Sequence, residues 1–345
     1  MGLGTDPLVG HHAARSGSRS GASPRSHAAA RDDMDRMAFI FPGQGSQSVG
    51  MARDLYESSQ TVREIYERAS EAIAVDLASI SFEGPEEELT KTINTQPALL
   101  TASAAALALL DERSIMPYAV AGHSLGEYTA LLAARSLSLE DAVRAVRERG
   151  RLMYEAGLEK PGTMAAIVGL TEEAIERILK DVGDKGLVQI ANLNTPTQIV
   201  ISGEVDAVRA AMDVAATSGA RRVVELKVSG AFHSGLLEGA SAGMESVLRS
   251  IPIERPQCIF IANVTGGALE DPEDIRKRLV EQIISPVRWV ECTKALANRK
   301  ASLFLEVGPG NVLRGLLRKT DPELKSMSAG KVSDIEKLSA ALATG

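Results

Sequence analysis

The chain has 345 residues, of which 44% are hydrophobic and 24% are charged. This balance is typical of a globular protein that is large enough to bury its core without disulfide bonds. The formal net charge of -7 argues against a nucleic-acid-binding protein, which normally presents a basic face. The two cysteines, Cys258 and Cys292, have no cysteine or histidine neighbour at metal-ligand spacing, so we expect two reduced thiols and no metal site.

Residues 1–36 differ in composition from the rest of the chain. They are rich in Gly, Ser, Ala and Arg and show no apolar periodicity, so we expect a disordered leader. Arginines and serines with few acidic residues are typical of a transit peptide, which would place the protein in an organelle matrix. An artificial leader or an over-extended start, with Met34 or Met37 as the initiator, leaves the protein cytoplasmic, and this is the location that we expect.

Strand, turn and helix alternate from Ala38 onward. Residues 38–41 form an apolar strand, and residues 42–46 form a Gly-rich turn before an amphipathic helix. Pro97 is expected at the start of a further helix. A second buried strand, over residues 118–121, leads into another turn and helix. Because helices separate these strands, we expect a parallel sheet that is covered on both faces.

The longest apolar run covers residues 98–110. It is shorter than the ~20 residues of a membrane span, and Thr101 and Ser103 interrupt it. We therefore expect a buried helix and no contact with a membrane.

The pattern changes to β-α-β-β-α-β between Gly162 and Val228, which is the order of the ferredoxin-like unit. The expected strands cover residues 163–169, 187–192, 198–202 and 222–228, and the expected helices cover residues 172–181 and 205–217. We therefore predict an α/β fold in two domains. Residues 37–160 and 229–345 form a large hydrolase-like domain with a parallel sheet and a serine elbow, and residues 161–228 form an inserted ferredoxin-like domain.

The sequence GHSLG at residues 122–126 has the G-x-S-x-G pattern between a predicted strand and a predicted helix. A sharp turn at this place exposes the serine hydroxyl, and the flanking glycines avoid side-chain clashes. The N-terminus of the following helix stabilises a developing oxyanion. This pattern predicts that Ser124 is a nucleophile.

A serine nucleophile needs a base, which is usually histidine. Of the five histidines, three lie in the leader, at positions 11, 12 and 27. His123 directly precedes the serine, so its side chain is expected to point away from the hydroxyl. Elimination favours His233 as the base over the alternative of a structural histidine in a loop.

Arg149 lies on the unexpected side of a predicted helix over residues 140–153. Helical phase groups Arg144, Arg147 and Arg151 on a solvated face, whereas Arg149 falls among apolar residues. A buried guanidinium needs an anionic partner. That partner is either a structural carboxylate such as Glu127 or the carboxylate of a substrate, which an arginine binds through two hydrogen bonds.

Six stretches follow one another in a recognisable order: FPGQGSQ at 41–47, TQPA at 95–98, GHSLGE at 122–127, RG at 149–150, AFH at 231–233 and EVGPG at 306–310. In these stretches the chain resembles the malonyl-CoA:acyl carrier protein transacylases of fatty-acid synthesis and the related acyltransferase domains of polyketide synthases. The resemblance covers essentially everything after Met37. It does not include the leader.

The resemblance implies roles for particular residues. It makes Ser124 the nucleophile, His233 the catalytic base and Arg149 the residue that binds the malonyl carboxylate. The backbone N–H groups of Gln44 and Leu125 would form the oxyanion hole.

Further roles follow from the same resemblance. The backbone carbonyl of Gln282 would orient the histidine in place of a triad aspartate. Phe232 is typical of malonyl-selective members, because its bulk crowds an α-methyl group. Arg221 and Arg222 match a basic pair at the domain junction and are expected at the carrier or CoA surface, although two solvated charges explain them equally well.

The implied reaction is a ping-pong transfer from malonyl-CoA to the phosphopantetheine thiol of acyl carrier protein, with no cofactor and in a monomer. A free-standing acyltransferase that loads polyketide carriers has the same chemistry and is the alternative. A serine hydrolase is a rival interpretation, because esterases have the same G-x-S-x-G pattern. It would need a triad acid and would give Arg149 no role. A non-catalytic docking module gives Ser124, His233 and Arg149 no reason to occur together.

Overall fold

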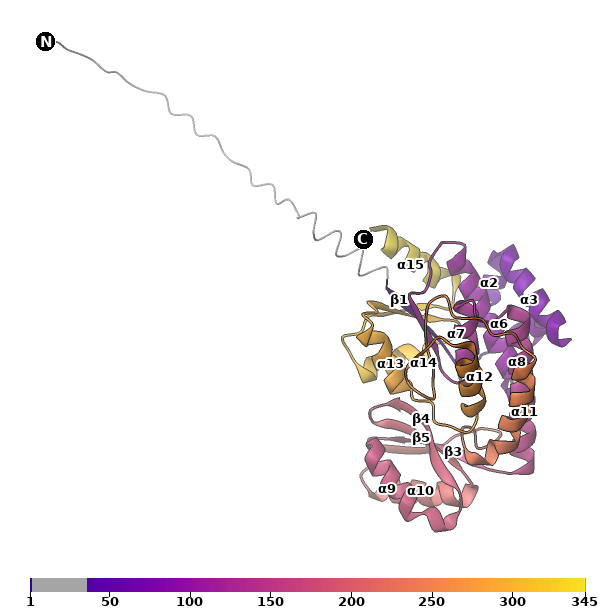
Figure 1. The fold of residues 1–345 in the computed structure, drawn as a ribbon, viewed down its shortest axis with the longest axis vertical. Coiled ribbons are helices and arrows are strands. Elements are labelled where there is room, and N and C mark those ends of the chain that lie inside the picture. Colours follow the sequence, from indigo (N-terminus) through magenta and orange to yellow (C-terminus); the bar gives the residue numbers. More distant parts are fainter. Residues whose placement is uncertain (2–35, 345) are drawn as a thin grey trace.

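The computed structural model describes residue 1 and residues 36–344. The predicted leader, with its transit-peptide alternative, otherwise lies outside the described residues. The described chain forms a large unit around a six-stranded sheet and a small unit around a four-stranded sheet. The small unit lies at one end of the molecule, where α9 and α10 are labelled (Figure 1).

The large unit contains both chain segments that flank the small unit. Its strands are β1 (Met37–Phe41), β2 (Ala119–Gly122), β7 (Ile259–Ile261), β8 (Ala268–Leu269), β9 (Leu303–Val307) and β10 (Ser326–Ala329). Its helices are α2 (Arg53–Ser58), α3 (Gln60–Ile73), α4 (Leu77–Phe82), α5 (Glu86–Thr90), α6 (Thr92–Asp111), α7 (Gly126–Ala133), α8 (Leu139–Glu159), α11 (Glu238–Arg249), α12 (Pro272–Glu281), α13 (Trp289–Asn298), α14 (Val312–Thr320) and α15 (Val332–Thr344).

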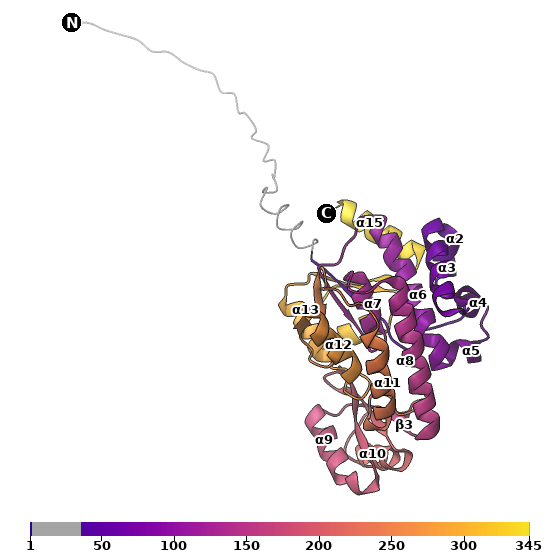
Figure 2. The ribbon, with the colours of Figure 1, turned by 45° about the vertical axis from the view of Figure 1, so that its right-hand side comes forward.

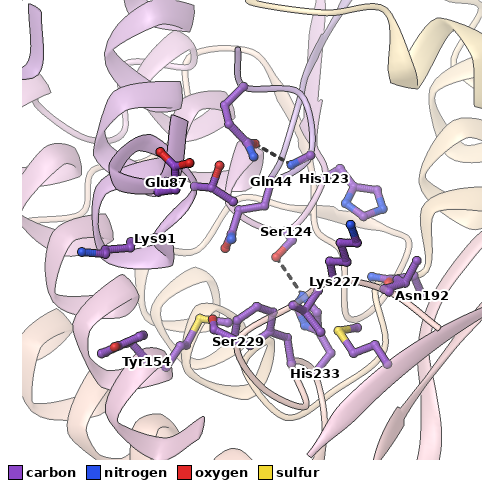
Figure 3. A pocket seen from close by; sticks show the side chains of 18 residues that line it. Gln44, Glu87, Lys91, His123, Ser124, Tyr154, Asn192, Lys227, Ser229 and His233 are labelled. Atoms are coloured by element: carbon purple, nitrogen blue, oxygen red, sulfur yellow. Dashed lines mark hydrogen bonds between the residues drawn. The ribbon is translucent and has the colours of Figure 1, made fainter. Parts of the chain in front are cut away.

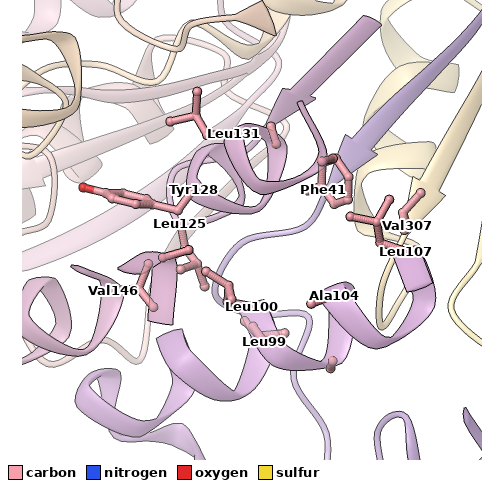
Figure 4. Close-up of a cluster of buried hydrophobic side chains, with 14 of the residues drawn as sticks. Phe41, Leu99, Leu100, Ala104, Leu107, Leu125, Tyr128, Leu131, Val146 and Val307 are labelled. Atoms are coloured by element: carbon pink, nitrogen blue, oxygen red, sulfur yellow. The ribbon is translucent and has the colours of Figure 1, made fainter. Parts of the chain in front are cut away.

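The large sheet has the strand order β10-β9-β1-β2-β7-β8, and all neighbours are parallel except β7 and β8. Side chains of β1 alternate between two cores, as the period of a strand requires. Phe41 belongs to the core that α6, α7 and α8 cover (Figure 4). Phe39 belongs to the same core. Ala38 and Ile40 belong to a second core, with Trp289 at the start of α13. The predicted mixed α/β fold with a parallel sheet covered on both faces is confirmed.

The turns after β1 and β2 begin side by side because the two strands are parallel and Phe41 pairs with Gly122. The backbone N–H of His123 donates to the carbonyl of Phe41 at 3.0 Å. A Cβ atom added to Gly43 would lie 2.4 Å from the carbonyl oxygen of His123. A side chain at this glycine would therefore separate the two turns, which carry Gln44 and Ser124.

Helix α6 corrects the expectation for Pro97, which lies inside the helix and not at its start. Since proline has no N–H, the carbonyl of Ile93 lacks its helical donor. The Nη1 atom of Arg147, on α8, donates to this carbonyl at 2.9 Å. Arg147 is therefore half-buried between two helices, and its expected place on a solvated face is wrong.

By length and composition, α6 is the one described helix that is suited to cross a membrane. However, 89% of its most apolar window is buried inside the protein. Its apolar surface is thus used in the core of the large unit.

The small unit consists of β3 (Thr163–Val168), α9 (Glu172–Asp181), β4 (Val188–Thr195), β5 (Gln198–Gly203), α10 (Val205–Thr217) and β6 (Arg222–Glu225). Its antiparallel sheet has the order β4-β5-β3-β6. Both helices begin and end where the sequence predicts, and they pack on the side of the sheet that faces away from the large unit (Figures 1 and 2). Backbone hydrogen bonds of 2.9 Å join Val287 to Ala191 and Leu193 of β4, so an isolated parallel β-bridge connects the two units.

The first residue of α7 provides a test of how closely the turns pack. A Cβ atom at Gly126 would lie 2.2 Å from the carbonyl oxygen of Phe41, so we expect Gly126→Ala to lower the free energy of unfolding by about 1–3 kcal/mol. At Gly315, within α14, no atom of residues 36–344 lies within 4 Å of an added Cβ, and Gly315→Ala should raise the free energy of unfolding by about 0.5–1 kcal/mol. Urea denaturation measures both. Equal effects of the two substitutions would contradict the close contact at Gly126.

Candidate active site

A cavity of about 700 Å³ lies where the two units meet (Figure 3). Gln44, Ser124 and His233 line it from the large unit, and Met164 of β3 and Asn192 of β4 line it from the small unit. The predicted nucleophile and base therefore face one cavity, together with two residues from the sheet of the small unit.

Ser124 lies in a sharp turn between β2 and α7. Its φ angle is 52°, in the left-handed region that non-glycine residues rarely adopt. A Cβ atom at Gly122 would lie 1.9 Å from the carbonyl of Gly126, so the two glycines of the motif are in direct backbone contact. This contact forces the strained turn and leaves the serine hydroxyl at the cavity wall.

His233 is hydrogen-bonded at both ring nitrogens. Its Nε2 lies 2.8 Å from the Oγ of Ser124, and its Nδ1 lies 2.8 Å from the backbone carbonyl of Gln282. A carbonyl only accepts, so Nδ1 carries the proton and Nε2 is free to accept from the serine hydroxyl. Burial and the Arg149 guanidinium lower the pKa of His233 from 6.5 to about 3, which keeps this imidazole neutral at physiological pH.

Arg149 is fully buried on α8 and its guanidinium points at Ser124. Its Nη1 donates to Gln96 Oε1 at 2.9 Å. Its Nη2 donates to Ser124 Oγ at 3.0 Å and to Gln282 Oε1 at 2.8 Å, and its Nε has no partner in the part of the chain that the structure describes. Among the described residues, no carboxylate lies within ion-pair distance of Arg149, and burial lowers its pKa.

The sequence offers Glu127 as a structural partner for Arg149. In the structure, the Gln282 side chain lies between them and forms a hydrogen bond with each. Gln282 donates from Nε2 to Glu127 Oε2 and accepts from Arg149 at Oε1. Burial raises the pKa of Glu127 to about 7, against the opposing effect of hydrogen bonds from Asn263 and Gln282 and of the Arg149 charge. The buried cation and the buried carboxyl group are thus separated by one amide.

The two residues expected to form an oxyanion hole differ in their exposure to the cavity. Gln44 lines the cavity, and Leu125 is the residue that directly precedes α7. Neither backbone N–H donates to a protein acceptor within the described part of the chain. The donors of an oxyanion hole need this lack of a protein acceptor.

The structure adds two site residues that the sequence analysis missed. Asn263 accepts from the backbone N–H of Ser124 at 2.8 Å and donates to the carbonyl of Gly122 at 2.7 Å. Gln96 accepts from Arg149. Gln96 belongs to the TQPA stretch, which was its signal in the sequence. Asn263 follows β7, the neighbour of β2, so its signal was a polar residue at the carboxyl end of β7.

Other predicted residues lie around the cavity or away from it. Phe232 lines the cavity and is 7% exposed. The ring of His123 points away from the serine hydroxyl, and its Nε2 lies 2.8 Å from Asn194 Oδ1. Arg221 and Arg222 are exposed, at the outer end of the edge strand β6, and they do not line the cavity.

The basic side chains at the cavity itself are Lys91 and Lys227, which the sequence analysis did not single out (Figure 3). Within residues 36–344, no three His, Cys, Asp or Glu side chains are grouped in a way that suits a metal ion. Cys258 and Cys292 are both free thiols.

Known proteins are similar to this chain over most of its length. The chain matches the family model of the acyl transferase domain over residues 38–338. It is 44% identical to the malonyl CoA-acyl carrier protein transacylase of Bacillus subtilis over 312 residues, which cover 90% of this chain and 98% of that protein. It is 40% identical to the transacylase of the same name from Haemophilus influenzae over 302 residues, which cover 87% of this chain and 97% of that protein.

Solved structures give the same result. The acyl-carrier-protein-S-malonyltransferase of Bartonella henselae superposes with a TM-score of 0.86 at 40% identity, over 89% of this chain and 99% of that one. A malonyl-transacylase solved with a type II polyketide synthase acyl-carrier protein superposes with a TM-score of 0.86 at 38% identity, over 90% of this chain and all of that one. Since the family model and these relatives cover nearly the whole described chain, the protein belongs to the malonyl CoA-acyl carrier protein transacylases, a family of acyltransferases.

Proposed function

We propose that this acyltransferase moves a malonyl group from malonyl-CoA to the phosphopantetheine thiol of acyl carrier protein, through an acyl-enzyme on Ser124. The observation that carries the proposal is the position of the Ser124 hydroxyl. Its oxygen lies 2.8 Å from a neutral histidine nitrogen and 3.0 Å from a buried guanidinium. A nucleophile, its base and a group that binds a carboxylate thus meet at one atom.

In the first half-reaction, Nε2 of His233 takes the proton of the Ser124 hydroxyl as the oxygen attacks the thioester carbonyl. The negative charge on the carbonyl oxygen is stabilised by the N–H groups of Gln44 and Leu125. The imidazolium of His233 is oriented by the carbonyl of Gln282, which stands where a triad acid would stand. When the carbon–sulfur bond breaks, His233 returns the proton to sulfur and CoA leaves as a thiol.

In the second half-reaction, the thiol of the carrier's phosphopantetheine arm takes the place of CoA. His233 removes the thiol proton, and the sulfur attacks the acyl-serine carbonyl. The carbon–oxygen bond then breaks, and the proton passes from His233 to Ser124. The same residues serve both half-reactions, and the transfer needs no cofactor.

Arg149 selects the acyl group. Its guanidinium donates to three neutral oxygens, and Nε has no acceptor among the described residues. A carboxylate is a stronger acceptor than any of these three oxygens. The malonyl carboxylate would replace Ser124 Oγ as a partner once that oxygen is acylated. Phe232 at the cavity wall excludes a branched α-carbon.

The acidic carrier protein would dock at the basic residues outside the cavity. Arg221 and Arg222 lie at one end of β6, and Lys227, at the cavity, follows its other end, about 15 Å further along an extended chain. The pair would hold the carrier while the phosphopantetheine arm reaches Ser124 along this strand. Carriers of fatty-acid synthesis are the proposed partners, and the likeness to a transacylase solved with a polyketide carrier keeps such carriers as the second candidate.

Several features of the fold belong to the same proposal. We infer that the turn at residues 122–126 is a serine elbow and that residues 161–228 are an inserted ferredoxin-like domain. Residues 37–160 and 229–345 would then be the hydrolase-like domain. We further propose that the protein works as a cytoplasmic monomer without contact with a membrane.

Ser124→Ala should abolish acyl-enzyme formation and transfer, because no other group replaces the nucleophile. Intact mass spectrometry after incubation with malonyl-CoA should show one added malonyl unit in the wild type and none in the variant. A variant that still gains this mass would show that the acyl group is carried elsewhere.

Arg149→Ala should slow acylation by malonyl-CoA by a factor of roughly 100 or more, because a buried carboxylate would lose its charged partner, at about 3–5 kcal/mol. Acetyl-CoA has no carboxylate, so its acylation rate should fall far less. Rapid-quench measurements with each thioester, at matched folded fractions, check this expectation. Equal losses for both thioesters would mean that Arg149 has a purely structural role.

His233 should remain neutral at pH 5, because its pKa in the folded protein is lowered to about 3. Since the unfolded chain takes up a proton near pH 6.5, His233 should also lower the free energy of unfolding as the pH falls below that value. NMR of isotope-labelled histidine, with His233→Gln to assign the signal, tests the first point. A ring that titrates near pH 6.5 would contradict it.

A further inference from the structure

Glu127 is a buried carboxyl group that the proposed mechanism does not use. It lies at the start of α7, is 1% exposed and does not line the cavity. Both of its oxygens accept hydrogen bonds. Oε1 accepts from the backbone N–H of Asn263 at 2.9 Å, and Oε2 accepts from Nε2 of Gln282.

The Gln282 side chain connects this carboxyl group to the reacting residues. Its Nε2 also donates to the backbone carbonyl of Ser124 at 3.0 Å, and its Oε1 accepts from Nη2 of Arg149 at 2.8 Å. Glu127 and the Ser124 carbonyl offer acceptors on one side, whereas Arg149 offers only donors on the other. The amide therefore has one favourable orientation, with its oxygen toward Arg149.

A glutamine could not replace the carboxylate in this network. Asn263 and Gln282 each present an N–H group to position 127, and a carboxylate accepts both with its two oxygens. A glutamine amide has one oxygen, so in either orientation an N–H group would face another N–H group. Rotation of the Gln282 amide would relieve this repulsion, but it would turn its nitrogen toward the Arg149 guanidinium.

The charged and titratable groups around Glu127 are few. Arg149 of α8 is the cation that acts on it, while Tyr128 of α7 and Cys292 of α13 are neutral, since burial raises the pKa of both. Burial also raises the pKa of Glu127 itself to about 7. Protonation near neutral pH has the same effect as the glutamine, because a carboxylic acid O–H would face one of the two N–H donors.

We propose that Glu127 is a positioning residue for malonyl transfer: its carboxylate orients the Gln282 amide, and that amide holds the Arg149 guanidinium beside Ser124. Glu127 acts through Gln282 and does not touch the substrate. The inference rests on the proposed function, in which Arg149 binds the malonyl carboxylate. Acylation of wild-type protein by malonyl-CoA tests that function separately.

The experiment compares acylation rates with malonyl-CoA and acetyl-CoA in wild type, Glu127→Gln and Glu306→Gln. Glu306 is a matched control, because it is also a buried carboxyl group whose two oxygens accept backbone N–H groups, those of Leu313 and Arg314, outside the active site. We expect Glu127→Gln to lower the malonyl-to-acetyl rate ratio roughly 10- to 100-fold, the usual effect of losing a hydrogen bond to a charged group. Glu306→Gln should leave this ratio unchanged, whatever its effect on stability.

Removal of the Glu127 charge has an opposing effect, because it leaves more positive potential at Arg149 for the malonyl carboxylate. If this effect is the larger one, the ratio in folded Glu127→Gln will stay the same or rise, and that result would overturn the proposal. A ratio that falls equally in Glu306→Gln would also overturn it, since the loss would then follow from stability alone.

If Glu127→Gln does not fold, the pH dependence of the malonyl-to-acetyl rate ratio in the wild type tests the proposal. The malonyl-to-acetyl ratio should fall as the pH decreases through about 7, as Glu127 takes up a proton. A ratio that is flat from pH 8 to pH 6 would overturn the proposal. A folded Glu127→Gln variant should show the low ratio at every pH in this range.

Discussion

Arg149 is a cation that the fold buries completely without giving it a carboxylate among the described residues, and much of the surrounding structure compensates for this. Uncharged oxygens of Gln96, Ser124 and Gln282 solvate its guanidinium in place of water. Burying a guanidinium without an anionic partner is costly, and an anion would complement such a site. Burial and, after it, the same charge lower the pKa of His233, so Arg149 also helps to keep this imidazole unprotonated.

Close backbone contacts hold this arrangement in place. Gly122 and Gly126 touch each other across the turn that carries Ser124, and Gly126 also touches the end of β1. Arg149 is followed by Gly150, whose added Cβ would lie 2.8 Å from the carbonyl oxygen of Thr92 on α6. Helix α8 can therefore approach α6 closely enough for the guanidinium to reach Gln96. The glycines beside the reacting residues thus determine distances within the site, in addition to the turn conformation.

The expectations for Pro97 and Arg147 from the sequence were both wrong, and a contact between α6 and α8 connects the two errors. Pro97 was expected to begin a helix, and Arg147 was expected to face solvent. Inside α6, the proline leaves the carbonyl of Ile93 without a helical donor, and Arg147 from α8 supplies that donor. Neither position is evident from its own neighbours in the sequence, because the unpaired carbonyl and the side chain that pairs with it belong to different helices.

The sequence by itself determined the features that depend on residues close together in the chain. The G-x-S-x-G turn, the buried helical phase of Arg149 and the bounds of α9 and α10 all follow from local spacing. The tertiary structure alone decided the orientation of the Gln282 amide and the roles of Asn263 and Gln96 in the network. Gln282 meets Arg149 and Ser124 across 133 and 158 positions, and Asn263 meets Ser124 across 139. Periodicity reports which face of an element is buried, but the partner at such separations is set by how strands and helices pack against one another.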